Sequence, residues 1–405
     1  SYHAGMITIK VKAGVEIPCP QLGSTDFTVP SLNAKASKFS INKIEKRFKH
    51  KPIPKDSGLP DLSRIYRICF SESLSVNEVI RAFQEDPNIE YAEPVPVDQV
   101  AEVPNDALYD LCQHLSQIFA PSAWDIHKGE NGAEEVIVAI VDTGIEWDHE
   151  DLQSNVWQNL AEDADGDGHT MELSAGQWVL DPGDINGIDD DGNGFTDDLI
   201  GWNFASNSND PKPLVTNPLK EHGTHCAGIA AGATNNGAGI ASVSYNVSVM
   251  GICADANNTL AWGYPGIIYA AENGAHVISN SWGGTNYSLA NQEAIDYATG
   301  LGSILVAAAH NYNNEIPIYP ASYTKAISVA SVGVTDYKAT YSNYGAMIDV
   351  AAPGGDYVDG GILSCISTGY SRKMGTSMAT PMVAGLMALV QSYHPEWSSL
   401  EAVSY

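Results

Sequence analysis

Three short runs, far apart in this chain, carry side chains that together could perform nucleophilic chemistry. They are VDTG at 141–144, HGTHCAG at 222–228 and GTSMATP at 375–381, and they supply Asp142, His222 and Ser377. A serine hydroxyl attacks a carbonyl only when a base takes its proton, and a histidine base needs a third group to fix its tautomer and stabilise its charged form. These residue types therefore predict a nucleophilic hydrolase.

The order of the three residues narrows the class of hydrolase. Aspartate, histidine and then serine is the order of the subtilisin type, whereas an α/β-hydrolase places its histidine last and carries GxSxG around its serine. Ser377 lacks that second glycine, because Ala379 stands there. The runs closely resemble the subtilisin-like serine protease family (subtilases), and the resemblance continues through SWGG at 281, VAAAHN at 306, YPASY at 319 and DVAAPGG at 349.

The resemblance implies an endopeptidase that acts on polypeptide substrates, and it assigns further roles. Asn311 aligns with the family asparagine that completes the oxyanion hole together with the Ser377 amide. The segment that pairs with the substrate backbone and lines the first specificity pocket aligns with Ser281, Trp282, Gly283 and Gly284. Trp282 could equally be a core residue.

One position departs from the family pattern, since His310 stands where relatives usually have glycine. It is either a harmless outward side chain, a specificity element that narrows the pocket, or a titratable group that makes activity depend on pH. Two alternatives to a broad endopeptidase stay open. One is a catalytically inactive subtilase-like binding or structural module, and the other is an enzyme that processes a single partner.

Composition separates two parts of the chain. At 405 residues the chain exceeds one ordinary core, so two domains are expected. Residues 1–100 hold 13 Lys/Arg against 12 Asp/Glu, whereas residues 101–405 hold 7 against 37, so the net charge of −29 belongs to the second part. This acidity disfavours a nucleic-acid partner. No apolar stretch approaches the length of a membrane span.

The cysteines indicate neither a zinc site nor a redox motif, because they are scattered and form no CxxC pair: Cys19, Cys69, Cys112, Cys226, Cys253 and Cys365. Cys226 follows His222 by one helical turn and resembles the cysteine that some subtilases carry there. Its default interpretation is a small buried hydrophobe. The first residues lack the features of a signal peptide, so a secreted location is expected from the family resemblance alone.

The first hundred residues are expected to form a small α+β unit. Alternating apolar residues predict strands at 6–11 and 64–70, and a last short strand is expected at 89–92. Between them, Ser75 and Glu78 predict a capping box at the start of a helix that Pro87 ends.

This unit runs into a Pro-rich segment and resembles a subtilase propeptide of ferredoxin-like fold, with an unrelated accessory domain as the alternative. The resemblance implies that residues 1–100 act as an intramolecular inhibitor. Residues 101–118 are then a linker with the processing site, and self-cleavage is expected between about Tyr91 and Asp110.

Residues 119–405 are expected to form an α/β domain, a subtilisin-like three-layer fold with a mostly parallel sheet. Buried strands are predicted at 136–141, 247–252, 276–279, 304–308 and 326–332, and helices at 222–233, 259–273, 289–300 and 377–392. Asp142 directly follows the first strand, at the end of a parallel sheet where ligands bind. Pro381 is expected in the first turn of the last helix, where a missing N–H costs nothing.

An acidic segment separates Asp142 from His222. Residues 145–210 hold 17 Asp/Glu and no Lys or Arg, so cations are the expected means of neutralisation. The alternating oxygen ligands of a calcium loop are matched by Asp189, Asp191, Asn193 and Asp197, although Ile200 replaces the closing glutamate of an EF-hand. A shorter run has the same opening without clear later ligands: Asp163, Asp165 and Asp167. The loop 234–240 also resembles a subtilase calcium loop, and solvated acidic loops are the alternative.

Overall fold

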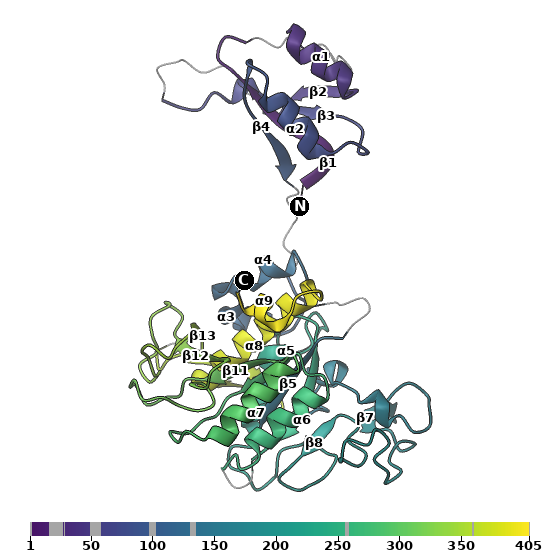
Figure 1. Cartoon of the computed structure of the whole chain (residues 1–405), viewed down its shortest axis with the longest axis vertical. Coiled ribbons are helices and arrows are strands. Elements are labelled where there is room, and N and C mark those ends of the chain that lie inside the picture. The colour runs from purple at the N-terminus through teal and green to yellow at the C-terminus, as the bar shows by residue number, and fades with distance from the viewer. Residues whose placement is uncertain are drawn as a thin grey trace. The chain divides into compact units, whose positions relative to one another are not determined.

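The computed structural model describes residues 2–15, 27, 29–48, 58–96, 103–129, 135–255, 259–358 and 360–404. The chain divides into two compact units, residues 1–100 and 101–405 (Figure 1). Cys19 and residues 97–102 of the expected cleavage region lie outside the described residues. In the part of the chain described here, no helix is long and apolar enough to cross a membrane.

The first unit is an antiparallel sheet with two helices packed on it. Its elements are β1 (Tyr2–Val11), α1 (Pro30–Lys38), β2 (Lys43–Lys46), the short 3-10 turn η2 (Leu62–Arg64), β3 (Ile65–Cys69), α2 (Val76–Gln84) and β4 (Ile89–Pro96). The strand order β2-β3-β1-β4 is that of a ferredoxin-like unit, as expected. Fully buried Ile7, Ile9 and Phe83 lie in its core.

Two details of this unit differ from the sequence predictions. Helix α1 and strand β2 were not anticipated, because α1 buries only Leu32 and Ala36 and therefore shows little apolar periodicity.

The capping-box prediction places the start of the helix correctly but is wrong about the hydrogen bond that caps it. Helix α2 does begin after Ser75, but the Ser75 side chain makes no capping bond. Its carbonyl instead accepts the N–H groups of Glu78 (3.1 Å) and Val79 (3.2 Å).

The second unit is built on a parallel sheet of order β13-β12-β11-β10-β5-β9-β8. Its strands are β5 (Ile137–Asp142), β8 (Gly201–Asn203), β9 (Ser248–Cys253), β10 (Val277–Asn280), β11 (Ile304–Ala308), β12 (Ala326–Val332) and β13 (Val350–Pro353). Two hairpins lie outside this sheet, β6 (Met171–Ser174) with β7 (Gln177–Leu180), and β14 (Ile362–Cys365) with β15 (Tyr370–Lys373). The helices are α3 (Gln113–Gln117), α4 (Ala120–Trp124), α5 (Glu221–Ala231), α6 (Gly263–Glu272), α7 (Leu289–Gly300), α8 (Thr376–Tyr393) and α9 (Ser399–Ser404).

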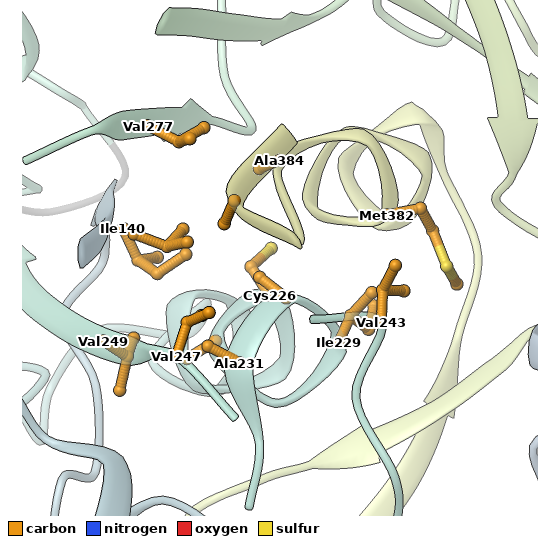
Figure 2. Close-up of a cluster of buried hydrophobic side chains, with 14 of the residues drawn as sticks. Ile140, Cys226, Ile229, Ala231, Val243, Val247, Val249, Val277, Met382 and Ala384 are labelled. Carbon is orange, nitrogen blue, oxygen red and sulfur yellow. The ribbon is translucent and has the colours of Figure 1, made fainter. Parts of the chain in front are cut away.

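Side chains of the central strand β5 alternate between two cores, because successive strand residues point to opposite faces of a sheet. Val138 and Ile140 pack with residues of α5 and α8 on one face. Figure 2 shows Ile140 beside Cys226 of α5 and Ala384 of α8. Ala139 and Val141 pack with residues of α6 and α7 on the other face. The sheet is thus the middle layer of three, which confirms the expected fold class.

Some boundaries of the second unit also differ from those predicted. Helix α6 begins at Gly263, later than predicted, and a Cβ built on Gly263 would overlap the indole of Trp282. Residues 103–118, expected to be a linker, belong structurally to this unit. Cys112 and Leu115 are buried in its core, and the Leu108 N–H donates to the Gly239 carbonyl over 2.6 Å.

Candidate active site

The end of strand β5 and the start of helix α5 bring Asp142 and His222 together. Nδ1 of His222 donates to Oδ1 of Asp142 over 2.7 Å. The Asp142 side chain is 1% exposed and that of His222 is 23% exposed, so the acid is enclosed while the base faces the cleft. Asp142 is the last residue of its strand and does not follow it, which corrects the sequence prediction by one position.

Two local features hold this pair in place. The Gly223 N–H donates to Thr143 Oγ1 over 2.9 Å, which ties the helix to the residue after Asp142. A Cβ on Gly223 would overlap the carbonyl of Gly144, so only glycine lets the helix approach this closely.

The environment of His222 favours its protonated form. Burial by itself lowers the pKa of His222, but the charge of Asp142 and the hydrogen bond to it outweigh burial. The pKa therefore lies above the ordinary value of 6.5. A carboxylate that stabilises the imidazolium in this way suits a histidine that must accept a proton during a reaction.

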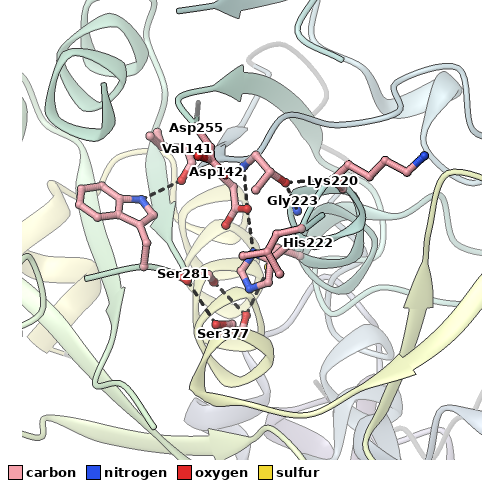
Figure 3. A network of polar contacts seen from close by, with 12 residues as sticks. Val141, Asp142, Lys220, His222, Gly223, Asp255, Ser281 and Ser377 are labelled. Carbon is pink, nitrogen blue, oxygen red and sulfur yellow. Dashed lines mark hydrogen bonds and ion pairs between the residues drawn. The ribbon is translucent and has the colours of Figure 1, made fainter. Parts of the chain in front are cut away.

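Ser377 lies in the first turn of helix α8, on the side of His222 away from Asp142 in the view of Figure 3. Its Oγ donates to the Ser281 carbonyl over 3.2 Å. Its own carbonyl accepts Oγ of Ser281 at 2.8 Å and Sγ of Cys226 at 3.3 Å.

Pro381 explains why the Ser377 carbonyl is free to accept hydrogen bonds from side chains outside helix α8. It was expected in the first turn of the helix, but α8 begins at Thr376 and Pro381 lies in its interior. The N–H that proline lacks is the one that would bond to the Ser377 carbonyl four residues earlier. The side chains of Ser281 and Cys226 donate to this carbonyl instead, which fixes the start of α8 against the segment after β10 and against α5.

A cleft of about 470 Å³ opens beside these residues. Its described lining contains Asp142, Asp255 and His222 but no Lys or Arg, and it includes Leu219, Leu260, Tyr264, Ser281, Trp282, Gly283, Gly284, His310 and Tyr319. The structure therefore brings all the residues predicted to bind substrate to the cleft that holds His222.

The segment from Ser281 to Gly284 forms one wall. Gly284 and Tyr319 exchange two backbone hydrogen bonds of 2.8 Å, and a Cβ on Gly283 would overlap the side chain of Ile318. Trp282 was expected to be either a substrate-contacting residue or a core residue, and it has features of both. It lines the cleft, and its Nε1 donates to the Val141 carbonyl over 2.9 Å. Tyr264 packs edge-on against its indole, with ring centroids 5.3 Å apart.

Asn311 is oriented by the residue before Ser377. Its Oδ1 accepts the N–H of Thr376 at 2.9 Å and the Thr376 hydroxyl at 3.0 Å, which directs Nδ2 away from them. A Cβ built on Gly375 would lie 3.5 Å from Asn311 Nδ2 and 3.6 Å from the Ser377 amide nitrogen. The two nitrogens thus lie near one point beside Gly375, and N–H donors placed together in this way can stabilise a developing oxyanion.

His310 lies in the wall of the cleft with a left-handed backbone, φ +81°. Its ring stacks on Tyr312 with centroids 4.4 Å apart. Burial lowers the pKa of His310, so the ring is neutral at neutral pH.

The side chains predicted to form a calcium loop accept hydrogen bonds within the acidic segment. Asp189 accepts backbone N–H groups of its own loop, and Asp197 accepts those of residues 186–187. The Asn193 amide donates to Asp191 Oδ2 over 3.0 Å. Of this run, only Asp191 joins a group of carboxylates, and its companions there are Glu162 and Asp198.

The shorter acidic run, Asp163, Asp165 and Asp167, lies close to two further aspartates that the sequence pattern did not indicate. Asp165 lies with Asp163 and Asp184 in one group and with Asp167 and Asp181 in another, and the oxygens of each group lie within 4.8 Å of one another.

Near the loop 234–240, Asp106 accepts the N–H groups of Asn235 and Asn236, and Asp151 accepts that of Ile240 at 2.7 Å. Sequence analysis missed these additional acids, whose only sequence signal was the overall acidity: Asp106, Asp151, Glu162, Asp181, Asp184 and Asp198.

Comparisons with known proteins agree with this geometry. The sequence model of the subtilase family matches residues 133–403. Thermitase of Thermoactinomyces vulgaris is 38% identical over 304 residues, which cover 74% of this chain and 89% of thermitase. The halolysin-like extracellular serine protease Nep of Natrialba magadii is 34% identical, over 78% of this chain and 50% of its own length.

A solved structure described as proteases from Pseudoalteromonas arctica PAMC 21717 superposes with a TM-score of 0.54 at 32% identity. The superposition covers 75% of this chain and 91% of that structure. Together with the family match over the second unit, these similarities settle what kind of protein this is: the chain belongs to the subtilase family of serine endopeptidases.

Proposed function

We propose that this subtilase is a secreted, calcium-stabilised endopeptidase that uses Asp142, His222 and Ser377 and is held as a zymogen by its N-terminal unit. The 2.7 Å bond between His222 and Asp142, in the cleft that Ser281–Gly284 lines, is the observation that carries the proposal. An extracellular site of action is supported by the name of the Natrialba magadii relative.

In the proposed mechanism, the Ser377 hydroxyl turns from the Ser281 carbonyl toward Nε2 of His222, which takes its proton. Hydrogen bonds of this kind often form only when substrate is bound. The alkoxide oxygen attacks the peptide carbonyl, and Asp142 stabilises the imidazolium. His222 then gives the proton to the leaving amine, and water hydrolyses the acyl-enzyme by the same route.

An extended peptide would lie along Ser281–Gly284, where glycines let its backbone approach. Main-chain pairing of this kind gives affinity with little sequence demand, which supports a broad substrate range. The neutral, stacked ring of His310 would act as a fixed wall that limits side-chain size at the first pocket.

Labelling with a fluorophosphonate tests the proposed nucleophile directly. We expect the probe to modify Ser377, as mapped by mass spectrometry of the digested protein. If neither the intact chain nor the chain after limited proteolysis is labelled, the protein is instead a non-catalytic subtilase module.

Loss of the Asn311 amide should slow turnover without weakening substrate binding. The Asn311→Leu variant is expected to lose about a hundred- to a thousandfold in kcat, the loss measured when the corresponding donor of subtilisin is removed, with KM nearly unchanged. Steady-state kinetics on a peptide anilide would measure this. Tyr312→Phe is the control, because it removes only an exposed hydroxyl next to Asn311. A kcat within a factor of two of the parent would exclude Asn311 from the oxyanion hole.

The N-terminal unit, residues 1–100, would act as the inhibitor of the catalytic domain, residues 119–405, with processing between about Tyr91 and Asp110. Its support is the ferredoxin-like strand order and its own separate core. We expect the uncut chain to be inactive, and its activity to rise together with a fragment cut in that range. An intact chain beginning at Ser1 that hydrolyses as fast as the cut one would refute zymogen control.

Calcium would neutralise the acidic segment. The donor sets are carboxylate oxygens, the ligands that calcium prefers. Residues that would hold it include Asp163, Asp165 and Asp184, where Asp184 is fully buried and one of its oxygens lacks a partner among the described residues. Asp167 and Asp181 form the adjoining group with Asp165.

A further inference from the structure

The cleft is bordered by a buried carboxylate that the proposed mechanism does not use. Asp255 lines the cleft together with His222 (Figure 3), although only 2% of Asp255 is exposed. It follows the extended end of β9, where the Ala254 N–H donates to the Asp142 carbonyl over 2.8 Å. The Ala254 carbonyl in turn accepts the Trp262 N–H at 3.3 Å. Backbone hydrogen bonds on both sides of the chain therefore hold Asp255 beside Asp142 and His222.

One carboxylate oxygen of Asp255 is paired and the other is not. Nδ2 of Asn217 donates to Oδ2 of Asp255 over 2.7 Å. Asn217 is itself fixed, because its Oδ1 accepts the Leu219 N–H at 2.8 Å. Oδ1 of Asp255 is buried and receives no hydrogen bond from any described residue. Because an unpaired charged oxygen is costly to bury, Oδ1 needs a donor that the described part of the chain does not supply.

The cleft also lacks a positive charge to match this carboxylate. Neither Lys nor Arg is among the described residues that line it, and across the described ranges Asp255 forms no ion pair. Asp142, the other acid of this lining, is already bonded to His222. Burial lowers the pKa of His222, the charge of Asp142 raises it, and the charge of Asp255 adds a smaller rise. Asp255 is thus close to the reacting groups and lacks a charged partner.

The order of the strands separates Asp255 from the first specificity pocket. The carboxyl ends of the parallel strands β11-β10-β5-β9 meet at one edge of the sheet. Ser281 follows β10 and His310 comes shortly after β11, on one side of β5. Asp255 comes shortly after β9, on the other side of β5. A substrate side chain that reaches Asp255 therefore belongs to a different residue from the one beside Ser281 and His310.

The surroundings of Asp255 suit a long basic side chain. Apolar and aromatic residues line the same cleft and can cover the methylene stem of such a side chain: Leu219, Leu260, Tyr264 and Trp282. Because Asn217 already occupies Oδ2, a single contact to Oδ1 is available, which suits a lysine ammonium better than the two-pronged guanidinium of arginine. Residues 101–405 hold 7 Lys/Arg against 37 Asp/Glu, an acidity that attracts basic peptides.

We propose that Asp255 is a specificity residue that receives a basic side chain of the peptide substrate, preferably lysine, at a position other than the one in the first pocket. The ammonium donates to Oδ1 of Asp255, and its stem lies against the apolar wall. The inference rests on the proposed endopeptidase function and names the kind of peptide that the cleft selects. It adds no step to hydrolysis.

Matched peptides test this role. Quenched fluorescent peptides with one common scissile bond, and one common residue before it, would carry lysine or norleucine in turn at each neighbouring position. Norleucine keeps the apolar stem and lacks the charge. At one position we expect the activated parent enzyme to show a kcat/KM at least about tenfold higher for lysine, the size of one hydrogen bond to a charged group. In the Asp255→Asn variant this preference should vanish.

The neutral peptides separate a role in specificity from a role in folding. Asp255→Asn should cleave the norleucine peptides nearly as fast as the parent, whereas a damaged fold would slow cleavage of all peptides alike and leave their ratio unchanged. Asp148→Asn is the matched control, because it removes an exposed acid that pairs with Lys212 and does not line the cleft. It should keep the lysine preference.

Two results would overturn the proposal. One is a parent enzyme that cleaves lysine and norleucine peptides equally at every position, and the other is an Asp255→Asn variant that keeps the lysine preference. If no peptide is hydrolysed, the proposed function fails instead, and calorimetry on the chain after limited proteolysis decides the role of Asp255. Lysine peptides should then bind more tightly than norleucine peptides to the parent but not to Asp255→Asn, and equal affinities for the parent would refute the inference.

Discussion

Replacing Ser377 by alanine is expected to abolish peptide hydrolysis, with kcat falling by about a million-fold, the size of the loss when the corresponding serine of subtilisin is removed. In the proposed mechanism this hydroxyl is the only group of the protein that forms a bond to the substrate carbon. A low residual rate, about 10³–10⁴ above that of the uncatalysed reaction, should remain, because the oxyanion donors and substrate binding are still present. Hydrolysis of a peptide anilide by the purified variant measures this.

The control for this substitution is Ser154→Ala, which removes an exposed serine hydroxyl outside the cleft. Circular dichroism and calcium-dependent unfolding should stay close to those of the parent for both variants, since alanine at 377 removes a single 3.2 Å hydrogen bond, to the Ser281 carbonyl, and no buried apolar group. If Ser377→Ala retains more than a few per cent of the parent rate, the nucleophile has been misassigned.

Replacing Asp142 by asparagine is expected to lower kcat by about 10⁴, because the amide no longer holds the imidazole in the correct tautomer or stabilises its charge. The geometry should survive, since asparagine fills the same space. Asp148→Asn is a matched control that removes an exposed acid paired with Lys212.

The pH profile gives a second, independent signature of this substitution. His222 must be neutral to accept a proton, so parent activity should fall as pH drops through its pKa, which lies above 6.5. Without the carboxylate, burial is the largest remaining influence on the imidazole, and it lowers the pKa of His222. The acid limb of kcat/KM should therefore move to lower pH in the variant, and a limb that moves up or stays in place would contradict the assigned role of Asp142.

Much of the fold could be predicted because its signals are local. The buried strands at 304–308 and 326–332 coincide with β11 and β12, and continuous apolar runs are what a strand covered on both faces requires. Helix α1 and strand β8 escaped prediction, since one buries few side chains and the other has only three residues.

Part of the candidate site could likewise be predicted from local sequence, and part could not. Its candidate residues Asp142, His222 and Ser377 could be predicted from the sequence, because each lies in a recognisable run. The convergence of Asn311 Nδ2 with the Ser377 amide was expected only through family resemblance. The role of Pro381 could not be foreseen, since it depends on where α8 begins and on which side chains reach the Ser377 carbonyl.

The candidate reacting groups, their order and the main strands and helices around them could be predicted from the sequence by itself, because each depends on residue types and short-range spacing. Only the tertiary structure decided which acids of the segment meet. The spacing of Asp189, Asp191 and Asn193 predicted one loop, but it could not reveal that Asp191 also lies close to Glu162 and Asp198. Spacing along a chain constrains neighbours within a turn, whereas packing of distant segments against helix α6 sets which carboxylates share a space.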